Sequence, residues 1–391
     1  MAMREELAYA LVTPYSLRKS RTGGIISRLI SRTGLDLVAG KIFAPTEDLA
    51  GAFSAGLVRH GNPRHRRTQE LIRDYVLDHL MPDITGRRSR CLLLLFRGEN
   101  AIIRLREVIG TIVTERTSGE TVRDTYGDYI LDSKGKVRHF EPAVLAGQDP
   151  DEVREHLLLW VAHSEMESGN LGGVVEFPPH SNVERTLVLL KPENFRFPNS
   201  RPGGIIDLFS RTGLFIVAFK VLHMSVSQAE EFYRPALAML ETVYRETIGS
   251  RAAEILEREL GIVPLRGLEK DLGAMLGPLA ARRRWEEIVA YMSGRSSSEC
   301  DSVERSRPGT QKSIALVYEG VDAVHKIRSI LGPTDPQNAP PGSIRKEFGQ
   351  TIMANSAHAS DSVANAEREM RIIDVWENNL KAEVEKFYGN T

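Results

Sequence analysis

The chain contains almost none of the features that mark exported or membrane-bound proteins. Only two of its 391 residues are cysteine, Cys91 and Cys300, which excludes a disulfide framework and a cysteine-rich metal site. No apolar run approaches the roughly 20 residues that span a bilayer. The charged start, residues 1–6, lacks the apolar segment of an export signal. We therefore expect a cytoplasmic protein without a membrane partner.

The chain also has no excess of charge of either sign. It carries 51 Lys and Arg residues against 52 Asp and Glu residues, a formal net charge of −1. A balanced chain offers no global field for nucleic acid, so we expect no nucleic-acid partner, and any anionic ligand must be held by a local arrangement of side chains. The hydrophobic content of 41% is ordinary for a globular protein.

One sequence pattern occurs twice in the chain. The glycine pair and Ser-Arg-Thr-Gly-Leu motif of residues 203–214 have an earlier counterpart at residues 23–35. A separation this long exceeds solenoid periods and indicates two copies of one domain. We predict a first domain at 1–163, a Gly-, Pro- and Ser-rich linker at 164–182 and a second domain at 183–391.

Two stretches of the second copy lack a good counterpart in the first. Residues 236–281 are charged and apolar at helical spacing, and residues 295–311 are rich in Ser, Arg and Glu without apolar period. We interpret both as insertions, the first helical and the second a mobile loop.

The order of apolar segments predicts the fold of each copy. Residues 7–13 and 185–191 favour a strand, and the helix that follows is introduced by the glycine pair. Residues 214–222 are β-branched and aromatic, and residues 91–96 and 313–318 are further apolar runs, each followed by a helix. This order predicts two α+β domains in tandem, each an antiparallel-sheet sandwich of the split βαβ, or ferredoxin-like, type. We expect Gly213 to cap the helix of the second copy in the left-handed conformation.

Residues suited to phosphoryl transfer are concentrated in the second copy. That reaction requires cations against the phosphate oxygens, a positioned nucleophile and a metal that bridges the phosphates. Lys191, Arg328 and Arg345 would supply the cations. His358 would be the nucleophile, because a neutral imidazole has an unprotonated nitrogen near pH 7. Glu369 would fix its tautomer.

The sequence after His358 predicts a helix that begins at Ser360 or Asp361. Either side chain would cap that helix, and the first amides would point toward an incoming phosphate.

Several spaced blocks of the second copy together resemble the nucleoside diphosphate kinase family, whose members move a terminal phosphate between nucleotides through a phosphohistidine. The blocks lie at residues 186–192, 285–292, 319–320, 328–336, 341–348 and 355–369, together with Tyr233. The resemblance implies a ping-pong kinase that acts on nucleoside di- and triphosphates, with Mg²⁺ brought in by the nucleotide phosphates rather than by a protein site.

The same resemblance implies a role for each matching residue. His358 is phosphorylated, Ser360 and Glu369 hold the imidazole, and Tyr233 adjoins it. The phosphate contacts are Lys191, Tyr233, Arg328, Thr334 and Arg345. Asn355 contacts the sugar, and Trp285 stacks on the base.

The first copy resembles the family more faintly and lacks its chemistry. Arg106 and Arg123 match two of the arginines, but Thr13 stands at the lysine position and Ala146 at the histidine position. We expect this copy to be a structural partner that pairs with the second as a homodimer subunit would. Weak nucleotide binding by the first copy stays open, as does assembly of whole chains into a homo-oligomer.

Two other functions stay open for the chain. The insertions, the inactive first copy and Ala359, where the family usually has glycine, also suit a catalytically weak nucleotide-binding or assembly module that retains the family fold. A third hypothesis is phosphotransfer from His358 to a protein partner.

Overall fold

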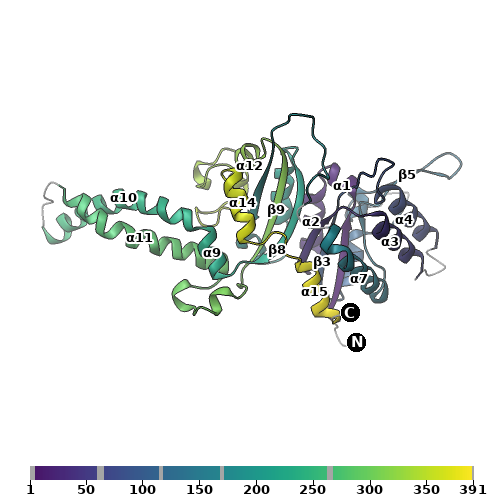
Figure 1. Cartoon of the computed structure of the whole chain (residues 1–391), viewed down its shortest axis with the longest axis horizontal. Helices are drawn as coiled ribbons and strands as arrows, with labels where there is room; N and C mark the ends of the chain where they lie inside the picture. Colours follow the sequence, from purple (N-terminus) through teal and green to yellow (C-terminus); the bar gives the residue numbers. More distant parts are fainter. Residues whose placement is uncertain (1–4, 60–65, 114–117, 168–170, 262–266, 390–391) are drawn as a thin grey trace. The chain divides into compact units, whose positions relative to one another are not determined.

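The computed structural model describes residues 5–59, 66–113, 118–167, 171–261 and 267–389 (Figure 1). Four stretches named in the predictions lie outside the described residues. They are residues 1–4 at the start of the first predicted domain, 168–170 of the predicted linker, 262–266 of the helical insertion and 390–391 at the end of the second predicted domain. The chain divides into two compact units. The first comprises Met1–Leu222, Ile314–Met370 and Asp374–Thr391, and the second comprises His223–Ser313 and Arg371–Ile373. Both repeated copies contribute their sheets to the first unit.

The first copy forms a four-stranded sheet in the order β2-β3-β1-β6. The central strands β1 and β3 pair antiparallel along their apolar runs, with Leu11 opposite Leu93. Its elements are β1 (Glu5–Val12), α1 (Pro14–Arg18), α2 (Thr22–Thr33), β2 (Asp36–Phe43), α3 (Glu47–Arg59), α4 (Arg66–His79), β3 (Cys91–Glu99), α5 (Ala101–Ile109), α6 (Val122–Tyr126), β4 (Asp128–Leu131), β5 (Val137–Glu141), β6 (Val144–Leu145) and α7 (Pro150–Glu167). Because α7 runs to Glu167, the first residues of the predicted linker are helical.

The second copy repeats this topology in the order β10-β7-β9-β8. Its elements that lie wholly or mostly in the first unit are β7 (Val183–Leu190), η2 (Pro192–Phe195), α8 (Arg201–Ser210), β8 (Phe215–His223), β9 (Lys312–Val321), α12 (Ala323–Leu331), η5 (Pro336–Asn338), α13 (Ile344–Phe348), β10 (Ala357–Ala359), α14 (Val363–Ile372) and α15 (Asn379–Tyr388). In both sheets the first strand lies between the third and the fourth, and the second strand is at the edge. The predicted split βαβ fold is therefore confirmed in both copies.

The two glycines after the repeated helices differ in their roles. Gly34 ends α2 with φ 64°, and its N–H donates to the Ile30 carbonyl, as a left-handed cap does. In the second copy α8 already ends at Ser210 with Arg211 as its C-cap, although Gly213 is also left-handed with φ 70°. The prediction that Gly213 caps the helix is therefore wrong, because a short turn separates the two.

The two copies pack on each other through α2 and α8. A Cβ added to Gly23 would lie 2.5 Å from the carbonyl oxygen of Gly203, so only glycine permits this backbone approach. The Ser27 hydroxyl donates to the Ser200 carbonyl at 2.7 Å across the same junction.

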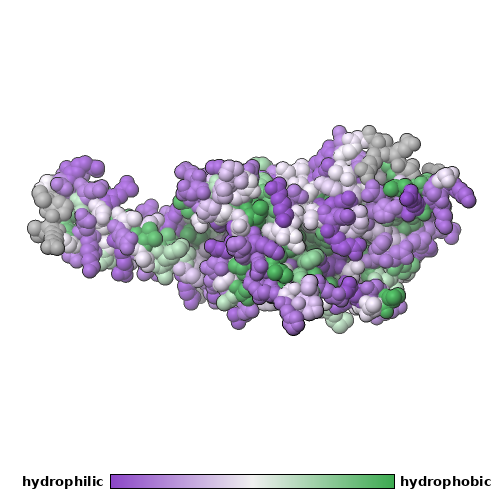
Figure 2. Space-filling view, turned by 90° about the horizontal axis from the view of Figure 1, so that it is seen from above, coloured by the Kyte–Doolittle hydropathy of each residue, from purple (hydrophilic) through white to green (hydrophobic). Residues whose placement is uncertain are grey.

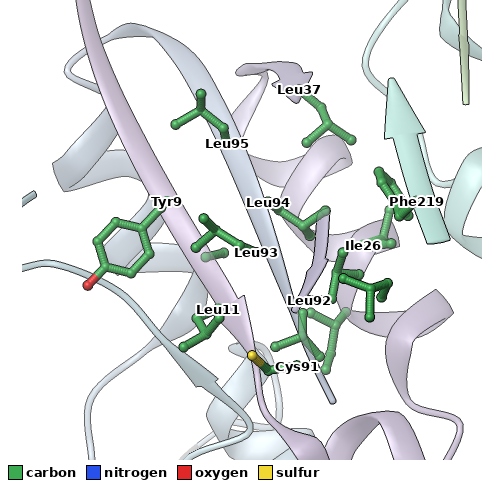
Figure 3. Packing of buried hydrophobic residues seen from close by; sticks show 14 of the residues in the cluster. Tyr9, Leu11, Ile26, Leu37, Cys91, Leu92, Leu93, Leu94, Leu95 and Phe219 are labelled. Atoms are coloured by element: carbon green, nitrogen blue, oxygen red, sulfur yellow. The ribbon is translucent and has the colours of Figure 1, made fainter. Parts of the chain in front are cut away.

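The hydrophobic core continues from the first copy into the second. Side chains of β3 alternate between the two faces of the sheet (Figure 3). Leu93 lies on the side of Tyr9, whereas Leu94 lies on the side of Ile26 and of Phe219, which belongs to β8 of the second copy. The copies therefore share buried apolar surface, which stabilises their association by roughly 25 cal/mol per Å² removed from water.

The C-terminal helix α15 packs on α7 and β2 of the first copy. Leu380 and Val384 on this helix are buried, and Glu383 forms an ion pair with Arg97 at 3.3 Å. The end of the second copy thus extends the structure of the first.

The second unit contains α9 (Val226–Phe232), α10 (Arg234–Leu260), α11 (Leu268–Ser293), η3 (Ser297–Glu299) and η4 (Glu304–Ser306). Helices α10 and α11 form a hairpin (Figure 1). A Cβ on Gly249 would meet the Glu269 carbonyl, and one on Gly273 would meet the Arg245 carbonyl, so the glycines let the backbones approach closely. Within residues 295–311, Arg305 forms an ion pair with Glu230 at 3.1 Å.

Hydrophilic side chains cover most of the face shown in Figure 2, with hydrophobic ones scattered between them. None of the helices in the described ranges combines the length and the apolar composition needed to cross a membrane.

Candidate active site

His358 lies on the short edge strand β10, opposite Leu189 of β7. Successive side chains of a strand point to opposite faces of the sheet. Ala357 and Ala359 are buried, whereas the side chain of His358 is 25% exposed. The strand therefore turns the imidazole away from the core while holding its backbone in the sheet.

A buried carboxylate orients the imidazole. Glu369, on α14, lies with Oε2 3.0 Å from His358 Nε2, and its side chain is only 6% exposed. The Ser360 hydroxyl donates to the same oxygen at 2.6 Å. Because a carboxylate only accepts hydrogen bonds, Nε2 bears the proton and Nδ1 carries the lone pair. The structure thus brings His358, Glu369 and Ser360 together, with Ser360 reaching the imidazole through the carboxylate.

Helix α14 begins later than the sequence predicts. It starts at Val363, and Ser362 Oγ accepts from the Asn365 N–H at 3.2 Å. The predicted start at Ser360 or Asp361 is wrong, because the Ser360 N–H extends the sheet by donating to the Leu187 carbonyl at 3.1 Å. The residue that caps the helix is Ser362.

Arg328 is exposed in the last turn of α12. The hydrogen bond from the Asn365 side chain lowers the pKa of the Asp361 carboxyl, and the charge of Arg328 contributes to the same direction. Helix α12, which carries Arg328, contacts β10, the strand that carries His358.

Lys191 lies beside Asn355 at the end of β7. Its Nζ donates to Asn355 Oδ1 at 3.0 Å and to the Met353 carbonyl. Asn355 Nδ2 donates in turn to the Thr334 carbonyl at 2.9 Å. Three predicted site residues that are far apart in the sequence therefore converge, and Lys191 is only 8% exposed.

Two residues that were not predicted hold the loop before His358. Glu193 Oε1 accepts from the Ser356 N–H at 2.8 Å, and Asn194 Nδ2 donates to the Ser356 carbonyl at 2.8 Å. Ser356 has a left-handed backbone with φ 75°. Their position directly after Lys191-Pro192 is the only sequence signal for them, and it says nothing of a contact more than 160 residues away.

The guanidinium of Arg345 contacts backbone carbonyls. Nη1 donates to Gly332 at 2.9 Å and Nη2 to Ala357 at 3.1 Å. Arg123 makes the matching contacts in the first copy, to Gly110 at 2.6 Å and Val144 at 3.0 Å. In both copies this arginine ties the loop after a helix to the edge strand.

Tyr233 and Trp285 lie in the second unit, where they contact each other. The indole N–H of Trp285 donates to the Tyr233 carbonyl at 2.9 Å, and Trp285 is 7% exposed. The indole is thus a packing residue of the helices, and its predicted stacking on a base stays a prediction, as does the predicted place of Tyr233 beside the histidine.

The register of the first copy corrects the sequence alignment. The Thr13 N–H donates to Ala143 O, just as the Lys191 N–H donates to Ser356 O. The residue two positions beyond the accepting carbonyl is therefore Leu145 in the first copy and His358 in the second. Leu145, not Ala146, takes the histidine position, because the turn before β6 cannot be aligned from sequence.

A hydrogen-bond network occupies the lysine position of the first copy. Glu141 accepts from the Thr13 hydroxyl at 2.8 Å and from the Tyr75 hydroxyl at 2.7 Å. Burial, followed by the charge of Glu141, raises the pKa of Tyr75. This copy has neither a nucleophile nor the lysine at the equivalent site.

Comparisons with known proteins agree on one family. A family model described as nucleoside diphosphate kinase matches residues 304–374, which include His358 and Glu369. The chain is 31% identical over 201 residues to the nucleoside diphosphate kinase of Pyrobaculum aerophilum, an alignment that covers 48% of this chain and 93% of the relative. It is 32% identical over 187 residues to that of Helicobacter pylori, covering 48% of this chain and 92% of the relative. The crystal structure of an NDP kinase from Pyrobaculum aerophilum is 30% identical, covers 50% of this chain and 96% of the other, and superposes with a TM-score of 0.33.

Proposed function

Since the chain belongs to the nucleoside diphosphate kinase family, we propose that its second copy transfers the γ-phosphate of a nucleoside triphosphate to a nucleoside diphosphate through a phosphohistidine at His358. The observation that carries this proposal is the alignment of His358, Glu369 and Ser360. A partly exposed imidazole on a sheet strand, oriented by a buried carboxylate, is the arrangement that a histidine nucleophile requires.

The reaction has two half-steps that reverse each other. Nδ1 of His358 attacks the γ-phosphorus, the bond to the bridging oxygen breaks, and the nucleoside diphosphate leaves with that electron pair. Glu369 meanwhile keeps the hydrogen on Nε2 and stabilises the positive charge on the ring. A β-phosphate oxygen of the second diphosphate then attacks the phosphorus, and the electrons of the P–N bond return to Nδ1.

The cations around the site would stabilise the charge that spreads over the phosphate oxygens in the transition state. We assign this role to Lys191 and Arg328, and to Arg345 once its backbone contacts exchange for phosphate. Thr334 would add a phosphate contact, and Asn355 would contact the sugar. Tyr233 and Trp285 would complete the site from the helical hairpin.

The residues of the site suit a magnesium ion that enters with the nucleotide. Across the described ranges, no three His, Cys, Asp or Glu side chains are grouped so that they would hold a metal ion, and the Glu369 carboxylate is engaged by His358 and Ser360. The ion would be held mainly by phosphate oxygens and water and would neutralise their charge.

The decisive experiment measures the phosphoenzyme. Incubation with γ-labelled ATP should give a phosphoprotein that is labile in acid and stable in alkali, and that discharges to a nucleoside diphosphate. His358→Ala should abolish both steps. His139→Ala is the matched control, because His139 is an exposed histidine on β5 of the first copy. A His358→Ala variant that still accepts the label would refute the proposal.

A second candidate function is nucleotide binding without phosphate exchange. It is favoured by the Arg345 guanidinium, which donates to two backbone carbonyls. Calorimetric binding of ADP to a chain that forms no phosphoenzyme would establish this function instead.

A further inference from the structure

The first copy contains a cavity at the position that corresponds to the catalytic site of the second. Its volume is about 390 Å³, and its lining includes Arg106, Arg123 and Ala146, the counterparts of Arg328, Arg345 and Ala359. Small-molecule sites in proteins typically have volumes of roughly 300–1,000 Å³. The network of Thr13, Tyr75 and Glu141 thus closes the lysine position without filling the neighbouring space.

The residues that line this cavity differ from their counterparts in the second copy in a consistent way. Helices α5 and α12 have the same length, and each ends at a glycine whose N–H caps the matching arginine carbonyl. Position-by-position comparison therefore places Ile103 against His325, Glu107 against Ser329 and Ile112 against Thr334. Each exchange replaces a polar group by an apolar or a negative one.

The charge that lines the cavity suits a single anionic group. Arg106 is exposed and donates from Nη1 to the Gln148 carbonyl at 3.0 Å. Arg123 is turned to the backbone carbonyls of Gly110, Pro142 and Val144. Glu107 contributes a carboxylate to the same wall. One guanidinium at the mouth beside one carboxylate supplies too little positive charge for a polyphosphate and suits a monoanion.

The apolar part of the cavity comes from isoleucines on two helices and the following loop. Ile72 and Ile109 are buried at 6% and 1% exposure, and Ile112 completes the wall. Ile103 is 57% exposed at the mouth, and a ligand that covers it would remove its apolar surface from water.

We propose that the first copy binds a small apolar carboxylate in this cavity. The carboxylate pairs with the guanidinium of Arg106, whose planar fork suits a bidentate contact. The hydrocarbon part lies against Ile72, Ile103 and Ile112. The first copy is therefore a ligand-binding domain whose ligand differs in chemistry from the nucleotide of the second copy. The proposal is independent of the activity of His358.

Titration calorimetry on the full chain with octanoate, octanamide and ADP tests the proposal. Octanoate should bind at one site per chain, and Arg106→Gln should weaken it about ten- to a hundredfold, the effect of losing a charge-assisted hydrogen bond of about 1.5–3 kcal/mol. Octanamide should bind more weakly by a similar factor. Arg328→Gln, the matched change in the second copy, should leave octanoate binding unchanged.

Ile103→His, which introduces the residue found at this position in the second copy, should also weaken octanoate binding. It serves as a second variant in case Arg106→Gln folds poorly. Absence of octanoate binding at millimolar concentration would overturn the proposal. So would equal binding of octanamide, or octanoate binding that neither variant weakens. Binding of ADP that depends on Arg106 would show that the cavity has kept a polyphosphate ligand and would equally refute the proposal.

Discussion

Gly23→Ala tests whether the close approach of α2 and α8 holds the two copies together. The new Cβ would lie 2.5 Å from the Gly203 carbonyl oxygen, 2.5 Å from the Asp207 nitrogen and 2.7 Å from the Asp207 Cα. All three are backbone atoms, so no side chain can rotate away. The helices must separate by roughly an ångström to restore van der Waals distances of about 3.5 Å.

The size of the effect follows from two destabilising contributions and one that stabilises. Overpacking costs about 1–3 kcal/mol, and separation of the helices stretches the hydrogen bond from Ser27 to Ser200, worth about 0.5–1.5 kcal/mol. The better helix propensity of alanine offsets at most about 1 kcal/mol. We expect Gly23→Ala to lower the free energy of unfolding by about 1–3 kcal/mol.

The assay is urea unfolding followed by circular dichroism, with Gly51→Ala as the control. Gly51 lies inside α3, and a Cβ there meets no atom within 4 Å among the residues described. Gly51→Ala should therefore stabilise the chain by about 0.5–1 kcal/mol. If Gly23→Ala stabilises the chain as Gly51→Ala does, the backbone contact between the copies does not exist as described.

Two further substitutions test the catalytic site and a buried cation. Glu369→Gln removes the charge that faces His358 Nε2 and should slow phosphoenzyme formation about ten- to a hundredfold in single-turnover measurements, whereas exposed Glu367→Gln on the same helix should not. Burial lowers the pKa of Lys41 to about 8 from 10.5, against the opposing charge of Glu165. Between about pH 8 and 10.5 the unfolded chain holds more protons than the folded chain, so the free energy of unfolding rises with pH. The urea midpoint should rise less across this pH range in Lys41→Met than in the unaltered chain. An equal rise in both would contradict the lowered pKa of Lys41.

The site is predictable from sequence where its residues lie in a short, spaced block. Residues 355–369 contain Asn355, His358, Ser360 and Glu369, and the short strand followed by a helix brings His358, Ser360 and Glu369 into one cluster. The sequence alone does not place the start of α14, because Ser360 and Ser362 are both good helix caps. The choice between them depends on whether the Ser360 N–H joins the sheet, which is a contact with β7.

The first copy shows the limit of the same reasoning. The spacing of Arg106 and Arg123 is legible in the sequence, but the β4–β5 hairpin inserted between α6 and β6 hides the register of the edge strand. Only the pairing of β6 with β1 places Leu145 at the histidine position. The guanidinium groups of Arg123 and Arg345 likewise donate to backbone carbonyls of other elements. The sequence does not predict these contacts.

The sequence by itself determined the duplication, the split βαβ order of each copy and the asymmetry of Lys191 and His358 against the first copy. These properties follow from local periodicity and from residue identity. Tertiary structure alone decided how Gly23 and Gly203 meet, where α15 packs and that a cavity lined by isoleucines remains in the first copy. Such features depend on which surfaces face each other after folding, and no local pattern records that choice.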